Sequence, residues 1–347
     1  MNTEFLGKNI SGLFTIPSGI VTTATSIIQA TFDDIPQIGV ITTKSVGLES
    51  RAGNREPVYS QYAPGCFVNA VGLTNPGAHV AAELMADLKV PEDRFLLTSI
   101  FGGSVEEFVE VAQIMAPVSD GLELNLSCPH ATGYGMAMGQ DPALVREITA
   151  AVKAVVDIPV VPKLTPNTPN IAEIALAAVE GGADAICAIN TLGPGYTSAH
   201  GHPVLSNGAG GMSGKAVLPI ALKCIREIRA VCDLPIIGCG GISSAADVRE
   251  TMDAGADVVG VGSALTGMTT AEMADYFNQL ESDICFASNK AENHIRYDID
   301  MNFEPVVLVK NERICDDICV LTFDRKINIQ AGEFVFLWVP GVGEKPF

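Results

Sequence analysis

Residues 234–265 have the sequence LPIIGCGGISSAADVRETMDAGADVVGVGSAL, which predicts a strand, a helix and a second strand. The two outer runs, Leu234–Gly240 and Asp257–Leu265, are rich in Ile, Val and Gly, as is typical of strands buried on both faces. Between them, Ser244–Ala254 has apolar residues at three- and four-residue spacing, which indicates a helix. A helical crossover between two parallel strands is the repeating unit of α/β folds.

This unit recurs back along the chain to about residue 13. Short apolar, β-branched runs are bounded by Gly, Pro or Asn, and most are followed by helical periodicity. The predicted strands are Leu13–Val21, Gly39–Val46, Arg94–Gly102, Asp120–Cys128, Ile158–Thr165, Asp184–Thr191, Leu234–Gly240 and Asp257–Leu265. Predicted helices include Val105–Met115, Pro142–Val156, Ile171–Glu180, Ala216–Cys232 and Ser244–Ala254. Eight such units predict a (β/α)8 TIM barrel, with an open doubly wound sheet as the alternative.

The remaining segments define the domain organisation. Residues 47–93 exceed a typical connection between a strand and a helix, so we expect them to cover the top of the barrel. After residue 285 the chain becomes polar, and beyond Pro305 it alternates like antiparallel strands. We predict a barrel domain over 1–285, a linker over 286–302 and a short all-β piece over 303–347. The last piece is too short to form an independent core without a partner.

Composition excludes several classes of protein. With 48% hydrophobic and 18% charged residues, the chain is expected to be globular rather than disordered or fibrous. The 21 Lys and Arg against 40 Asp and Glu give a net charge of −19, which argues against nucleic-acid or membrane partners. This acidity fits either a high-salt cytosol or ordinary solubility.

Cysteine usage and the absence of apolar spans suggest a location. The nine cysteines include no close CxxC pair, so neither a disulfide framework nor a metal site is predicted. No export signal or membrane span is recognisable in the sequence. We therefore expect a cytoplasmic protein.

Polar residues follow several predicted strands at the end where a barrel carries its active site. They are Thr43-Lys44-Ser45, Asn125 to His130, Lys163 to Asn167, and Asn190-Thr191. Lysines at strand ends suit a bound anion or an electron-rich ring, although a single lysine can also reach out to solvent. Asparagines such as Asn69, Asn125 and Asn190 suit a planar ligand with alternating carbonyl and N–H groups, although they also cap turns.

Two further features suggest a phosphate group and a reactive thiol. The seventh strand ends at Gly240 and Gly241, and the eighth ends with Gly262 and Ser263, which is the usual phosphate site of such barrels. Tight turns alone would also explain these glycines. Cys128 lies in a loop near several glycines and could act as a base or nucleophile, although most free cysteines are inert.

With these motifs together, the chain resembles class 1 dihydroorotate dehydrogenases, especially the NAD-linked class 1B catalytic subunit. The matching motifs occur in family order over about 1–285. They are TKSVGLE (43–49), NAVGLTNPG (69–77), NLSCPH (125–130), GQDP (139–142), KLTPN (163–167), INT (189–191), GGMSG (210–214), CGGI (239–242) and VGSAL (261–265). The resemblance implies a barrel that binds one FMN and oxidises dihydroorotate to orotate in pyrimidine biosynthesis.

The resemblance also implies residue roles. Cys128 is the expected base for the C5 proton of the substrate. Expected pyrimidine contacts are Lys44, Asn69, Gly72, Leu73, Asn125, His130, Asn190 and Thr191. Expected FMN contacts are Ser18, Gly19, Lys44, Ser45, Ser99, Asn125, Lys163 and Gly214, with Gly240, Gly241, Gly262 and Ser263 at the phosphate.

Two departures from the family pattern bear on the substrate. The family usually has Asn at the positions of His130 and Ser99. His130 also occurs in dihydropyrimidine dehydrogenases, which share NLSCPH and GQDP, so a pyrimidine reductase of that kind is the alternative. Those enzymes carry cysteine runs of the CxxCxxC kind, which do not occur in this sequence. A non-catalytic flavin-binding scaffold is an alternative of another class.

The tail from about residue 303 resembles the start of the class 1B electron-transfer subunit, a ferredoxin-reductase-like β-barrel. The resemblance implies that FAD and a 2Fe–2S cluster belong to a partner subunit, in a homodimer or a heterotetramer. The tail itself is either a truncated fusion or a stub with a docking role.

Overall fold

The computed structural model describes residues 2–126, 138–199, 201–285, 306–315, 318–326, 336–339 and 343–346. Its centre is a closed barrel of parallel strands in the order β10-β15-β16-β3-β4-β7-β8-β9. These strands are β3 (Phe14–Ile16), β4 (Ile38–Thr42), β7 (Phe95–Ile100), β8 (Gly121–Asn125), β9 (Val160–Leu164), β10 (Ile186–Ala188), β15 (Ile236–Cys239) and β16 (Val258–Gly260). Each overlaps one of the eight predicted runs. The predicted (β/α)8 barrel is confirmed, and the open-sheet alternative is wrong.

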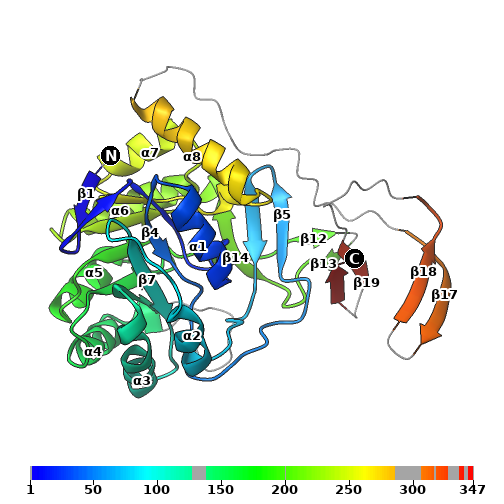
Figure 1. Cartoon of the computed structure of the whole chain (residues 1–347), viewed down its shortest axis with the longest axis horizontal. Helices are drawn as coiled ribbons and strands as arrows, with labels where there is room; N and C mark the ends of the chain where they lie inside the picture. Colours follow the sequence, from blue (N-terminus) through cyan, green and yellow to red (C-terminus); the bar gives the residue numbers. More distant parts are fainter. Residues whose placement is uncertain are drawn as a thin grey trace.

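Helices surround the barrel (Figure 1). They are α1 (Thr25–Asp34), α2 (Ala78–Met85), α3 (Val105–Met115), α4 (Pro142–Lys153), α5 (Ile171–Glu180), α6 (Leu218–Arg229), α7 (Ala245–Asp253) and α8 (Thr270–Cys285), with short 3-10 turns η1 (Ala116–Val118), η2 (Met138–Gln140), η3 (Lys215–Val217) and η4 (Ser263–Leu265). Helix α7 shows how side chains fix the first turn of a helix. The Ser244 side chain accepts a hydrogen bond from the Asp247 backbone, and the Asp247 side chain accepts one from Ser244.

An N-terminal hairpin closes one end of the barrel. Its strands are β1 (Asn2–Phe5) and β2 (Lys8–Ser11), and the sequence analysis did not predict them. Phe5 and Ile10 are buried with the side chains that fill the barrel interior. The Phe5 ring meets the edge of Phe95, the first residue of β7, with ring centroids 5.4 Å apart. The hairpin therefore packs against the amino ends of the strands.

A four-stranded antiparallel sheet is inserted into the connections that follow the carboxyl ends of the strands. Its order is β11-β14-β6-β5, with β5 (Tyr59–Ala63), β6 (Cys66–Asn69), β11 (Leu192–Gly195) and β14 (Gly210–Gly214). Strands β5 and β6 come from the long stretch that we expected to cover the barrel. Strands β11 and β14 come from a second insertion, after β10, that the sequence analysis missed. A two-stranded ribbon, β12 (Ser198–Ala199) and β13 (His202–Pro203), lies in the same insertion.

The C-terminal tail forms separate antiparallel hairpins. Strand β17 (Leu308–Cys315) pairs with β18 (Ile318–Phe323), and β19 (Phe336–Val339) pairs with β20 (Gly343–Pro346). The β17–β18 hairpin stands apart from the barrel (Figure 1), and Val307 and Val309 are each 63% exposed. An antiparallel β appendage after the barrel is thus confirmed. In the described ranges, no helix has the length and apolar character needed to cross a membrane.

Candidate active site

A cavity of about 540 Å³ lies where the carboxyl ends of the barrel strands meet the inserted sheet. This volume is in the usual range for a small-molecule or cofactor site. Most of the residues expected at the site line it. They are Ser18, Gly19, Lys44, Ser45, Asn69, Gly72, Leu73, Asn125, Lys163, Asn190, Thr191, Gly214, Gly240, Gly241, Gly262 and Ser263.

Three further residues were expected at the site. Cys128 and His130 lie outside the described residues. Ser99 is fully buried behind the wall, and its Oγ is 2.9 Å from the Oγ of Ser45. Among the described residues, Ser45 connects the Ser99 hydroxyl to the cavity wall.

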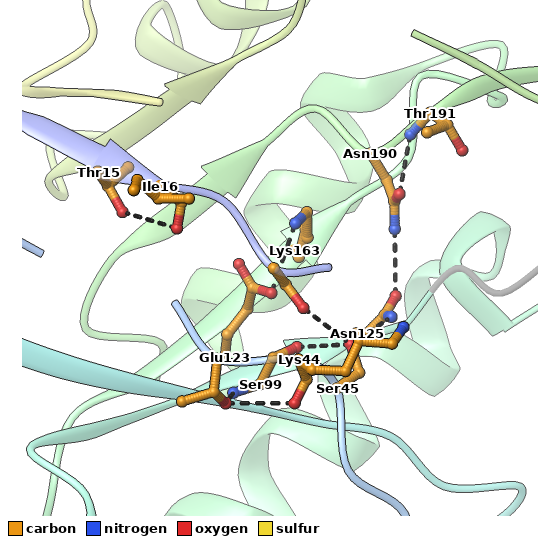
Figure 2. Close-up of polar contacts among 12 residues, drawn as sticks. Thr15, Ile16, Lys44, Ser45, Ser99, Glu123, Asn125, Lys163, Asn190 and Thr191 are labelled. Carbon is orange, nitrogen blue, oxygen red and sulfur yellow. Dashed lines mark hydrogen bonds and ion pairs between the residues drawn. The ribbon is translucent and has the colours of Figure 1, made fainter. Parts of the chain in front are cut away.

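A chain of polar side chains links the ends of β4, β8 and β10 (Figure 2), and Ser18 extends it to the end of β3. Asn190 donates from Nδ2 to Oδ1 of Asn125 at 3.1 Å, and Asn125 donates from Nδ2 to Oγ of Ser45 at 3.0 Å. Ser45 also contacts Ser18, with 3.1 Å between the hydroxyl oxygens. Asn190 is further oriented by the Thr191 backbone N–H, which donates to its Oδ1 at 2.8 Å. These side chains hold one another in fixed orientations around the cavity.

The loop that carries Gly72 and Leu73 is fixed by a residue that the sequence analysis did not single out. Asn75 is buried, accepts hydrogen bonds from the backbones of Gly47 and Gly77, and donates to the Leu73 carbonyl at 2.8 Å. Leu73 has a φ of +61°, a strained value for a side-chain-bearing residue. The sequence signal that could have identified Asn75 is the NPG tripeptide at the end of the motif NAVGLTNPG (69–77).

Two lysines reach the cavity, one from β9 and one from the segment after β4. Lys163 is buried, with Nζ 3.5 Å from Oε1 of the buried Glu123. Burial alone lowers the pKa of Lys163, but the charge of Glu123 outweighs burial and raises that pKa overall. Lys163 is therefore a fixed positive charge on the wall, and Lys44 is a second cation there.

Glycine turns follow β15 and β16 on the cavity wall. Gly241 has a φ of +76°, and a Cβ there would come within 2.6 Å of the Gly214 carbonyl oxygen and 2.9 Å of the Leu218 nitrogen. Only glycine fits this position without displacing the backbone. The turn lets main chain form the cavity surface, which suits a phosphate group.

Tyr59 belongs to the wall residues that the sequence analysis missed. It lies on β5, stacks on Phe67 with ring centroids 5.3 Å apart, and its hydroxyl is 3.0 Å from Oγ1 of Thr266. Burial raises the pKa of Tyr59, so the phenol stays protonated. Tyr59 connects the inserted sheet to the segment after β16. Other missed wall residues are Ile189, Met212 and Met268, which carry no polar strand-end signal.

Comparison with known proteins identifies relatives over the barrel. The sequence model of a family described as "Dihydroorotate dehydrogenase" matches residues 1–282. A protein of Methanosarcina acetivorans is 43% identical over 271 residues, which is 77% of this chain and 85% of the relative. One of Methanocella arvoryzae is 47% identical over 230 residues, 65% of this chain and 75% of the relative. One of Pyrococcus horikoshii is 40% identical over 266 residues, which is 76% of this chain and 86% of the relative. All three relatives are named dihydroorotate dehydrogenase B (NAD(+)), catalytic subunit.

Proposed function

The chain belongs to the dihydroorotate dehydrogenase family, and we propose that it is the FMN-binding catalytic subunit of an NAD-linked, class 1B enzyme. As a member of this family it is a flavin-dependent oxidoreductase that oxidises dihydroorotate to orotate in pyrimidine biosynthesis. One observation carries the finer proposal: glycine turns, two lysines and a chain of asparagines line the same cavity.

FMN fits the chemistry of this cavity. Gly240, Gly241, Gly262 and Ser263 would hold its phosphate, because their turns present main chain where a Cβ at Gly241 would collide with backbone. The flavin ring and ribityl chain would be held by Ser18, Gly19, Lys44, Ser45, Lys163 and Gly214. Ser99 would support this set through Ser45.

The pyrimidine would lie over the asparagine chain. Asn69, Asn125, Asn190 and Thr191 offer amide and hydroxyl groups that match its alternating carbonyl and N–H groups. Backbone at Gly72 and Leu73, together with Lys44 and His130, would complete this contact set. The hydrogen bonds among Ser45, Asn125 and Asn190 fix these amides before substrate arrives.

The reaction separates a proton and a hydride. Cys128, as general base, takes the proton from C5 of dihydroorotate. When bound, the flavin supplies the acceptor for the hydride from C6. The lysines and asparagines would orient the substrate so that C5 is accessible to Cys128 and C6 to the flavin. The inserted sheet would limit access of water.

These assignments give each part of the chain a proposed role. Residues 1–285 form the FMN and pyrimidine domain, 286–302 are a linker, and 303–347 are a partial ferredoxin-reductase-like piece. Electrons then pass to a separate subunit that holds FAD and a 2Fe–2S cluster and reduces NAD. The names of the relatives, which specify an NAD-linked catalytic subunit, support this arrangement.

Flavin analysis tests the cofactor assignment. Flavin released by acid from the purified protein, after reconstitution with an equal mixture of FMN and FAD, is separated by chromatography. We expect about one FMN per chain and almost no FAD. FAD alone, or no flavin, would contradict the assignment of the glycine turns.

A further inference from the structure

Glu123 is a buried acid that none of the roles above uses. It lies on β8 with its side chain inside the barrel and is 1% exposed. Its Oε1 is 3.5 Å from Nζ of Lys163 (Figure 2). Its Oε2 is buried and has no hydrogen-bond partner among the described residues. A buried charged carboxylate is unfavourable unless it interacts with a nearby positive charge.

Among the described residues, few charged or titratable groups face Lys163. Glu123 faces it from β8, Cys187 from β10 and Cys239 from β15, and Lys44 lines the same cavity. Cys187 shares a hydrogen bond with Cys239, and together with burial this raises its pKa well above the usual value, so that its thiol stays neutral. Glu123 is therefore the negative charge that balances the Lys163 ammonium.

We propose that Glu123 is a positioning residue that keeps Lys163 charged, directs its ammonium to the cavity, and sets the net charge under the bound flavin ring. This inference rests on the proposed function, because it takes the flavin ring to lie beside Lys163. Glu123 itself is not on the cavity wall. It acts through Lys163.

The direction of the expected change in flavin midpoint potential follows from the net charge of the Glu123–Lys163 pair. In the wild type the pair is neutral, and the raised pKa of Lys163 keeps it so across the working pH range. In Glu123→Gln the pair carries one positive charge, which favours the electron-rich reduced flavin and raises its midpoint potential. Without the acid, burial lowers the pKa of Lys163, so the lysine loses its proton as pH rises and the extra charge disappears.

The experiment measures the flavin midpoint potential against pH in FMN-loaded protein. For Glu123→Gln we expect a potential above that of the wild type at low pH, by about tenfold in the reduced-to-oxidised ratio or about 30 mV for two electrons. This difference should vanish at high pH. Lys163→Met leaves the acid unbalanced, so it should lower the potential at high pH, where the acid is ionised. The double variant should return close to the wild type without a pH step.

Asp184→Asn is the matched control. Asp184 pairs with Lys153 at 2.6 Å outside the cavity wall, so its removal should leave the potential curve unchanged. Coincident curves for Glu123→Gln and the wild type would overturn the inference. If Glu123→Gln does not fold, an unchanged potential in Lys163→Met would overturn it instead. Absence of FMN from the wild type would contradict the proposed function, which is a separate outcome.

Discussion

Asn190 donates a hydrogen bond from Nδ2 to Oδ1 of Asn125 at 3.1 Å, and this bond connects the segment after β10 to the last residue of β8. Strand β9 lies between these two strands, so the bond spans the carboxyl end of a neighbouring strand. Both amides line the cavity. Their orientations are therefore coupled, and a substitution of one asparagine should alter the orientation of the other amide.

Asn190→Ala is expected to weaken substrate recognition. It removes one amide from the cavity wall and leaves Asn125 with an unmet acceptor, a loss of about 1–3 kcal/mol. The kcat/KM for dihydroorotate should fall by about 10- to 100-fold, while FMN content stays unchanged. Asn207→Ala, at an exposed asparagine off the cavity wall, is the control. Equal kcat/KM values for the two variants would contradict the role of Asn190.

Gly241→Ala is expected to weaken FMN binding. Its new Cβ would meet the Gly214 carbonyl and the Leu218 nitrogen, so the turn at the phosphate must shift. We expect the dissociation constant for FMN to rise by about tenfold or more, measured by fluorescence titration of apoprotein. Gly208→Ala is a matched control, because Gly208 has a similar φ of +79° and open space around its Cα. Both variants bear the backbone strain of about 1–2 kcal/mol, but only Gly241→Ala should lose FMN affinity.

Cys128→Ala is expected to keep FMN and lose chemistry. General bases contribute about 10²–10⁴-fold, so the rate of flavin reduction by dihydroorotate should fall by that factor in stopped-flow measurements. Cys285→Ala, at the exposed end of α8, should react like the wild type. An unchanged rate in Cys128→Ala would reject its role as the base, and loss of FMN would show a structural role.

Removal of residues 303–347 is expected to leave the barrel chemistry intact. All proposed flavin and pyrimidine contacts precede residue 285, and the tail hairpin β17–β18 has exposed apolar residues such as Val307 and Val309. FMN content and dihydroorotate oxidation with an artificial dye should stay close to the full-chain values. Neither form should reduce NAD rapidly without a partner subunit. Loss of FMN on deletion, or fast NAD reduction by the full chain alone, would contradict the proposed division of labour.

The barrel was predictable from sequence because its strands are buried on both faces. Runs such as Ile158–Thr165 must be apolar along their whole length when helices cover one side and the barrel interior the other. The second insertion was missed for the opposite reason. Its strands, LGPG at Leu192–Gly195 and GGMSG at Gly210–Gly214, have almost no hydrophobic pattern, and the pairing of β14 with β6 is a long-range contact.

The site was predictable where a polar residue ends a strand, as at Asn125 and Lys163. It was less predictable where a residue acts from behind the wall. Glu123 sits two residues before Asn125 inside an apolar strand, and nothing local shows that it meets Lys163 on the next strand. Asn75 works through backbone contacts with Leu73 in its own loop and with Gly47, which precedes β5, and these contacts are visible only in three dimensions.

We propose above that the cavity binds FMN and delivers to it a hydride from dihydroorotate. Anaerobic titration of the FMN-loaded chain with dihydroorotate, followed by the visible absorbance of the flavin, tests this most directly. We predict that dihydroorotate bleaches the flavin in a single rapid phase at about one equivalent per chain, while dihydrouracil leaves it oxidised under the same conditions. Bleaching by dihydrouracil but not by dihydroorotate, or by neither, would contradict the account.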